Sequence, residues 1–220
     1  VFTGSNETAR LIQQALARRE GPIAPLIAET GGINAMIVDS SALTEQVVRD
    51  ALTSAFDSAG QRCSALRVLF LQEEIADRTL LMLTGAMREL VIGDPFDLST
   101  DIGPVIDEPA EEVLMAHKLR MRRQGKLVLD LELPLACRAG TYVSPAVYEI
   151  DNMAALDREV FGPILHVVRY RRENLDKVCA AIGASGYGLT LGVHSRIADT
   201  ADFIAERVNV GNLYVNRNQI

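Results

Sequence analysis

Apolar residues recur at helical spacing in several stretches of the chain. The first stretch begins after Ser5 or Asn6, either of which can cap a helix, and it ends before Gly21-Pro22. A later stretch is closed by Gly60, and another opens at Pro109, a residue that suits the first turn of a helix. Helices are therefore predicted over about residues 5–19, 43–58, 73–90, 109–123, 174–182 and 198–208.

Short apolar runs alternate with these helices. The clearest run is Ile164 to Tyr170, which is rich in β-branched residues. Because strands and helices alternate, we predict an α/β fold in which helices cover both faces of a largely parallel sheet. Strands are predicted over about residues 23–28, 35–38, 66–71, 127–129, 142–143, 146–150, 164–170, 190–194 and 212–215.

Composition narrows the class of partner. The chain has 220 residues and a net charge of −7, which argues against direct binding of nucleic acid, because neutralising phosphates requires clustered cations. One basic stretch, from Lys118 to Lys126, runs along the end of a predicted helix, where we expect solvated cations that suit the helix dipole. No apolar run approaches the roughly 18 residues needed to span a bilayer.

The cysteines and histidines show no metal-ligand spacing. The three cysteines form no CxxC pair and cannot all be joined in disulfides, and no signal peptide is visible, so a reducing cytoplasmic setting is expected. The three histidines are scattered, and no metal site is predicted. These residues are Cys63, Cys137, Cys179, His117, His166 and His194.

The pairing of Cys63 with Glu29 is the sharpest chemical signal in the sequence. Cys63 follows Gly60-Gln61-Arg62 in a predicted loop, and Glu29 lies 34 residues earlier, directly before Thr30-Gly31-Gly32. A cysteine in a loop with free backbone N–H groups can act as a nucleophile, and a nearby carboxylate can act as a general base. Taken alone, a cysteine or a glutamate of this kind is more often structural. A third sequence block supports the functional interpretation of the pair.

The third block is Glu159-Val160-Phe161-Gly162-Pro163, which begins 96 residues after Cys63. Together the three blocks resemble the aldehyde dehydrogenase superfamily. The sequence from Glu29 to Leu43 and from Ser54 to Phe70 is similar to the pyrroline-5-carboxylate dehydrogenase part of bacterial bifunctional proline-utilisation enzymes. The usual family motif has Leu at the position of Thr30, a change that leaves the carboxylate untouched.

The resemblance implies a role for each block. It implies that Cys63 attacks an aldehyde to form a thiohemiacetal, that hydride passes to NAD, and that Glu29 activates the water that hydrolyses the thioester. It also implies that Glu159 binds the hydroxyls of the nicotinamide ribose and that Phe161 packs near the nicotinamide. The implied substrate is L-glutamate γ-semialdehyde, with Ser64 contacting its carboxylate.

Four further residues are assigned to the cofactor by the resemblance. Gly4 and Ser5 match the family's pyrophosphate contact, where the N-terminal amides of a helix meet an anion. Thr30 and Gly31 follow the general base, where a small residue lets the backbone approach the cofactor.

The implied fold is a three-layer aldehyde dehydrogenase catalytic domain. We expect residues 1–28 to be the C-terminal remnant of a Rossmann-like NAD-binding domain and residues 29–220 to be the catalytic domain, cut before the oligomerisation segment. The chain opens without Met and stops soon after a predicted strand, so we expect a piece of a longer polypeptide that folds but binds NAD weakly by itself.

The suspected parent adds further expectations. FAD would belong only to a separate proline dehydrogenase domain, and the parent would be cytoplasmic, a homodimer or higher oligomer, and membrane-associated or DNA-binding through other domains. Three alternatives stay open at this point: an aldehyde dehydrogenase of other specificity, a folded segment without activity, and a cysteine hydrolase that pairs Cys63 with His166 or His194.

Overall fold

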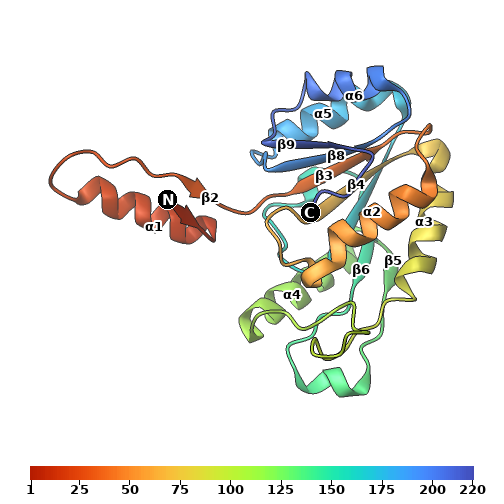
Figure 1. Cartoon of the computed structure of the whole chain (residues 1–220), viewed down its shortest axis with the longest axis horizontal. Coiled ribbons are helices and arrows are strands. Elements are labelled where there is room, and N and C mark those ends of the chain that lie inside the picture. Colours follow the sequence, from red (N-terminus) through yellow and green to blue (C-terminus); the bar gives the residue numbers. More distant parts are fainter.

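The computed structural model describes all residues 1–220 and centres on a seven-stranded sheet (Figure 1). The strand order is β5-β6-β7-β4-β3-β8-β9, and every neighbouring pair is parallel except β5 with β6. The strands are β3 (Asn34–Val38), β4 (Leu66–Gln72), β5 (Lys126–Asp130), β6 (Ala146–Glu149), β7 (Ile164–Tyr170), β8 (Thr190–His194) and β9 (Asn212–Val215). The predicted α/β fold with a largely parallel sheet is thus confirmed.

Helices connect the parallel strands and cover both faces of the sheet. Figure 1 shows α2 and α3 on one side of the strands, with α5 and α6 on the other. The helices are α1 (Asn6–Arg18), α2 (Thr44–Phe56), α3 (Glu73–Met87), α4 (Glu108–Gln124), α5 (Leu175–Ala184) and α6 (Ala198–Ala205). Short 3-10 helices lie at η1 (Asp57–Gly60), η2 (Leu135–Ala139), η3 (Met153–Ala155) and η4 (Arg172–Asn174). No helix combines the length and the hydropathy that crossing a membrane requires.

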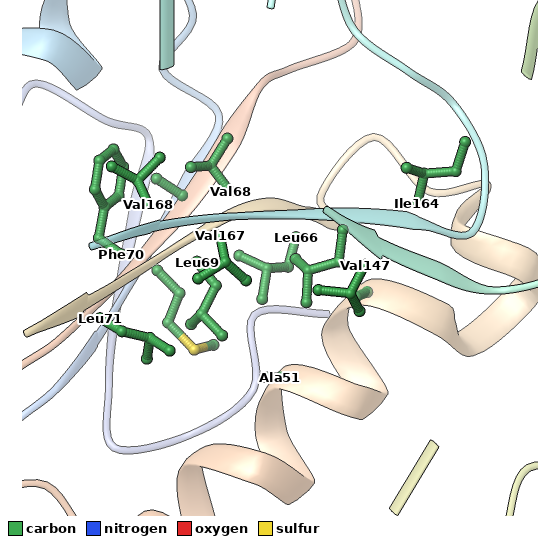
Figure 2. Close-up of a cluster of buried hydrophobic side chains, with 14 of the residues drawn as sticks. Ala51, Leu66, Val68, Leu69, Phe70, Leu71, Val147, Ile164, Val167 and Val168 are labelled. Carbon is green, nitrogen blue, oxygen red and sulfur yellow. The ribbon is translucent and has the colours of Figure 1, made fainter. Parts of the chain in front are cut away.

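The core sits on the two faces of the central strands. All residues of β3, β4 and β8 are buried, as expected for parallel strands that are covered on both sides. In Figure 2, Leu69 of β4 and Val167 of β7 point toward Ala51 of α2, while Phe70 and Val168 point to the opposite side. Alternate side chains therefore fill two separate layers, which is what a continuous apolar strand can do.

The N-terminal part forms a second, smaller sheet. Strand β1 (Phe2–Thr3) pairs in parallel with β2 (Ala28–Glu29), and α1 connects them in a unit that extends away from the large sheet (Figure 1). The strand predicted over residues 23–28 is wrong except for its last residue. Pro25 cannot donate a ladder hydrogen bond, and Ile23 is fully exposed with no layer to pack against.

Two other predictions need correction. Residues 142–143 form no strand, because the backbone N–H of Tyr142 turns back to the carbonyl of Gly140 at 2.9 Å and is not free for a ladder hydrogen bond. Lys118 is not a solvated cation, since it is buried and donates to Asp130 at 2.6 Å and to the hydroxyl of Ser144 at 2.8 Å. The remaining predicted helices and strands are confirmed, with ends that differ by a few residues.

Candidate active site

The three sequence blocks meet at one edge of the sheet. Cys63 precedes β4, Gly31-Gly32 precede β3, and Glu159 precedes β7. These strands are adjacent and parallel, so their amino ends share an edge. The ligand-binding crevice of open α/β sheets normally lies at the carboxyl ends, so the candidate site uses the opposite edge.

Cys63 lies in a tight, exposed turn. The backbone N–H of Ala65 donates to the carbonyl of Arg62 at 3.0 Å, and the Cys63 thiol is free and exposed. The location in a turn between α2 and β4 confirms that part of the prediction. An exposed thiol can reach a substrate, whereas a buried thiol cannot.

Asn34 holds this turn against the sheet. Its Nδ2 donates to the carbonyl of Cys63 at 2.7 Å and to that of Ala65 at 3.0 Å. Its Oδ1 accepts from the backbone N–H of Thr190 at 3.2 Å, which ties the turn to β8 as well. Sequence reasoning missed Asn34, although a buried amide at the first position of an apolar strand is a recognisable signal, because it needs partners.

A left-handed segment delivers the chain from α2 to the cysteine turn. Ser58, Ala59 and Gly60 have φ values of 56°, 53° and 66°. Gly60 packs against the carbonyl of Gly162 so closely that a Cβ would not fit. Glycine is therefore required here for two reasons, its positive φ and its close approach to the Glu159 block.

Arg67 connects the cysteine turn to the Glu159 block. Its Nη2 donates to Glu159 Oε1 at 3.2 Å and to the carbonyl of Arg62 at 3.2 Å, and its Nη1 donates to the carbonyl of Gly162 at 3.1 Å. The guanidinium also lies 5.4 Å from the centre of the Phe161 ring, a cation–π distance. This residue is only 1% exposed, and sequence reasoning missed it.

Glu159 is a partly desolvated carboxylate. Burial raises its pKa, while Arg67 and the backbone N–H of Gly32 act in the opposite direction. Its side chain is 14% exposed, and a Cβ on Gly31 would overlap its Oε2 atom. Phe161, two residues on, leaves its ring partly exposed. An accessible carboxylate beside an exposed apolar ring fits a ribose and a flat aromatic ring, since the carboxylate retains lone pairs for further donors.

The candidate general base and pyrophosphate residues lie together in the small sheet. Glu29 is exposed and pairs with Thr3, and the backbone N–H of Gly4 donates to the Glu29 carbonyl at 3.1 Å. Ser5 caps α1 by accepting from the N–H of Thr8 at 3.2 Å. From near-attack geometry with one bridging water, we predict that the Cys63 sulfur is directed toward Glu29 at a separation of roughly 5–8 Å.

Ser64 is held by its backbone. Its carbonyl accepts from the hydroxyl of Thr190 at 3.3 Å and from Nε2 of Gln219 at 3.4 Å. Thr30 and Ser64 are both half-buried, next to the exposed Glu29 and Cys63. Gln219 is fully buried, and it was not singled out in the sequence because its partner lies 155 residues away.

The histidines do not support a cysteine hydrolase. His166 is fully buried, and its ring nitrogens contact His117 Nε2 at 2.9 Å and the carbonyl of Arg67 at 3.0 Å. His194 is also buried, and its Nε2 lies 3.6 Å from a carboxylate oxygen of Asp50. Both imidazoles are engaged elsewhere than at Cys63, as expected for histidines inside apolar strands.

Comparison with known proteins identifies the family to which this arrangement of residues belongs. The model of the aldehyde dehydrogenase family matches residues 1–220. The bifunctional protein PutA of Klebsiella aerogenes is 58% identical over all of this chain, which spans 17% of that protein. A 1-pyrroline-5-carboxylate dehydrogenase of Geobacillus is 32% identical over 98% of the chain, which spans 42% of the relative.

Solved structures indicate the same family. A crystal structure of bifunctional proline utilization A (PutA) superposes with a TM-score of 0.96 and 59% identity, covering all of this chain and 22% of that one. The 1-pyrroline-5-carboxylate dehydrogenase from Thermus with bound NAD gives a TM-score of 0.86 and 28% identity, covering all of this chain and 42% of that one. With its exposed cysteine turn, its Glu159 block and this full-length match, the chain belongs to the aldehyde dehydrogenase family.

Proposed function

We propose that the protein to which this chain belongs oxidises L-glutamate γ-semialdehyde, the open form of pyrroline-5-carboxylate, to L-glutamate with NAD. The observation that carries the proposal is the exposed Cys63 turn, tied through Arg67 to Glu159 at one edge of the sheet. The substrate follows from the names of the relatives, bifunctional PutA and 1-pyrroline-5-carboxylate dehydrogenase.

Cys63 forms the covalent intermediate. Its thiol gives up a proton, the sulfur attacks the aldehyde carbon, and the aldehyde oxygen takes the electron pair and a proton, which leaves a thiohemiacetal. The exposed position of Cys63 in its turn permits this approach. Ser64, the next residue, contacts the carboxylate of the substrate.

In the second step the thiohemiacetal loses a hydride from its carbon and the proton of its hydroxyl to solvent, which leaves a thioester. NAD, when bound, supplies the hydride acceptor. Glu159 would accept hydrogen bonds from the hydroxyls of the nicotinamide ribose, and Phe161 would pack beside the nicotinamide ring. Gly31 lets the Glu159 carboxylate pack against the backbone, and Thr30 and Gly31 would border the cofactor. Gly4 and Ser5 would present the N-terminal amides of α1 to the pyrophosphate.

Glu29 completes the reaction. Its carboxylate takes a proton from a water molecule, the water oxygen attacks the thioester carbon, and the carbon–sulfur bond breaks. Glutamate leaves with the new oxygen, and Cys63 returns as a thiolate. Glu29 is exposed, so water can reach it.

We also propose that residues 1–28 belong to the NAD-binding domain and residues 29–220 to the catalytic domain. The separate two-stranded sheet of β1 and β2 supports a division at this place in the chain, with Glu29, the last residue of β2, at the junction. The parent is proposed to be a cytoplasmic bifunctional protein whose FAD serves a separate proline dehydrogenase domain, an assignment supported by relatives that are named bifunctional. We propose that the parent is a homodimer or higher oligomer and that any membrane or DNA binding is made by its other domains.

The decisive experiment separates the two chemical roles in the intact parent. Cys63→Ala is expected to abolish NADH formation from the semialdehyde, because no covalent intermediate forms. Glu29→Gln is expected to retain a first-turnover burst of NADH and to slow steady turnover, because only thioester hydrolysis is lost. Glu20→Gln, a change at an exposed carboxylate after α1, serves as the control and should turn over normally. Normal turnover in either active-site variant would refute the assignment.

A further inference from the structure

A continuous series of polar contacts runs from the surface to the centre of the site. Arg120 of α4 donates from Nη1 to Asp157 at 3.0 Å, and its Nη2 lies 3.1 Å from Nδ1 of His117. His117 Nε2 lies 2.9 Å from Nε2 of His166, and Nδ1 of His166 lies 3.0 Å from the carbonyl of Arg67. The two rings meet edge to face, with an interplanar angle of 86°.

The groups at the two ends of this series of contacts fix the position of every proton within it. Arg120 can only donate, so Nδ1 of His117 accepts and its proton sits on Nε2. That proton is donated to Nε2 of His166, whose own proton therefore sits on Nδ1. The Arg67 carbonyl can only accept, which agrees with that tautomer. Both imidazoles are neutral, because a second proton on either would bring two N–H groups face to face.

The series of polar contacts from Arg120 to Arg67 ends at an irregularity in the sheet. Asn34 is in register with Leu66, but the next residue, Ala35, is in register with Val68, so Arg67 is an extra residue on β4. Such a bulge re-aims the side chain of the extra residue, and bulges gather next to active sites. Here the re-aimed side chain is the guanidinium that holds Glu159 and the Arg62 carbonyl.

We propose that the His117–His166 pair is a positioning element of the active site: it holds the bulge at Arg67 and, through the Arg67 guanidinium, sets the places of Glu159 and of the Cys63 turn. The inference builds on the proposed function. Neither imidazole touches the reacting atoms, so both are positioning residues. The charged groups that face the pair are Arg120, Asp157 and Arg158 from one side and Arg67 from the other.

The test is His166→Leu in the intact parent, which removes the donor to the Arg67 carbonyl at similar volume. Two readouts that need no aldehyde substrate are used, namely NAD affinity by calorimetry and the rate of Cys63 alkylation by iodoacetamide. A displaced Glu159 makes weaker charge-assisted hydrogen bonds to the ribose, so NAD affinity is expected to fall about 10-fold, and the rate of Cys63 alkylation is expected to change. His166→Gln, whose amide can donate to the same carbonyl, should recover most of the affinity.

Tyr170→Phe is the matched control. Tyr170 lies on the same strand and also donates to a backbone carbonyl, that of Val38 at 3.1 Å, but near the carboxyl end of the sheet. Loss of general stability would affect both variants, whereas loss of positioning affects His166→Leu alone. Arg120→Met provides a second variant, because Arg120 is partly exposed and its loss is expected to shift both readouts about 3-fold in the same direction.

Unchanged NAD affinity and alkylation in folded His166→Leu, or equal changes in Tyr170→Phe, would overturn the proposal. Should His166→Leu not fold, unchanged readouts in Arg120→Met would do the same. These outcomes are separate from failure of the proposed function, which would appear as absence of semialdehyde oxidation by the unmodified parent.

Discussion

Gly31 and Glu159 are packed so closely that a methyl group on Gly31 would occupy the place of the carboxylate oxygen Oε2. The two residues lie 128 positions apart in the sequence, and they meet because β3 and β7 both flank β4. Arg67 of β4 binds the other carboxylate oxygen at 3.2 Å. Glu159 is thus fixed between an obligatory glycine and a buried cation, which leaves it few positions to adopt.

Gly31→Ala is expected to displace Glu159 and to weaken NAD binding about 10-fold or more, in line with the cost of leaving a charge-assisted hydrogen bond unmade. Calorimetric titration of the intact parent with NAD measures the effect. Gly183→Ala is the control, because Gly183 lies in α5 and a Cβ there meets no atom within 4 Å. The control should bind NAD normally and gain about 0.5–1 kcal/mol of stability. Normal NAD binding by Gly31→Ala would contradict the predicted role of this contact.

Gly60→Ala is expected to destabilise the protein more than Gly186→Ala does. Both glycines have positive φ, 66° and 74°, so both substitutions cost about 1–2 kcal/mol in backbone strain. Only at Gly60 would the new Cβ also strike a backbone carbonyl, that of Gly162, whereas the space at Gly186 is open. The midpoints of urea unfolding compare the two variants. Equal midpoints would mean that the approach of Gly60 to Gly162 contributes nothing.

The three thiols should differ sharply toward iodoacetamide. Cys63 is exposed, while Cys137 and Cys179 are 4% and 2% exposed. Burial also raises the pKa of the Cys179 thiol, which lowers its thiolate fraction at neutral pH. Peptide mass spectrometry after brief treatment of the native protein should find Cys63 modified and the other two intact. Urea should make all three equally reactive, and early modification of Cys179 in the native protein would contradict the packing of α5.

Much of the fold could be predicted from the sequence, because the buried strands and helices carry their periods plainly. The run from Leu66 to Gln72 is apolar at five of its seven positions and forms β4. The strand predicted over residues 23–28 failed because apolar character alone does not supply a neighbouring strand or layer. The two-residue strand β1 offers partners only to Ala28 and Glu29.

The candidate site was predictable only in part, for a physical reason. Cys63, Glu29 and the Glu159 block stand in recognisable local motifs, so they could be named from the sequence. Arg67 could not, since its role depends on partners 92 and 95 residues away and on a bulge that no local pattern encodes. Its signal was a charged residue inside an apolar strand, which requires buried partners.

Acid should destabilise the protein through the buried imidazoles. Burial is the main cause that lowers the pKa of His117 to about 4 and that of His166 to about 3, against about 6.5 in the unfolded chain. The stability that depends on neutral imidazoles is complete above pH 6.5 and is lost as the pH falls toward those values, because the unfolded state binds protons first. Between pH 7 and pH 5 the loss is about 2 kcal/mol for each ring, because the slope approaches about 1.36 kcal/mol per pH unit below pH 6.5. The double variant His117→Gln/His166→Gln should therefore show a smaller fall in its urea midpoint between pH 7 and pH 5 than the unmodified protein. Some fall should remain, since burial also lowers the pKa of His194 in both proteins. An equal fall in both would show that these two rings do not carry the acid sensitivity.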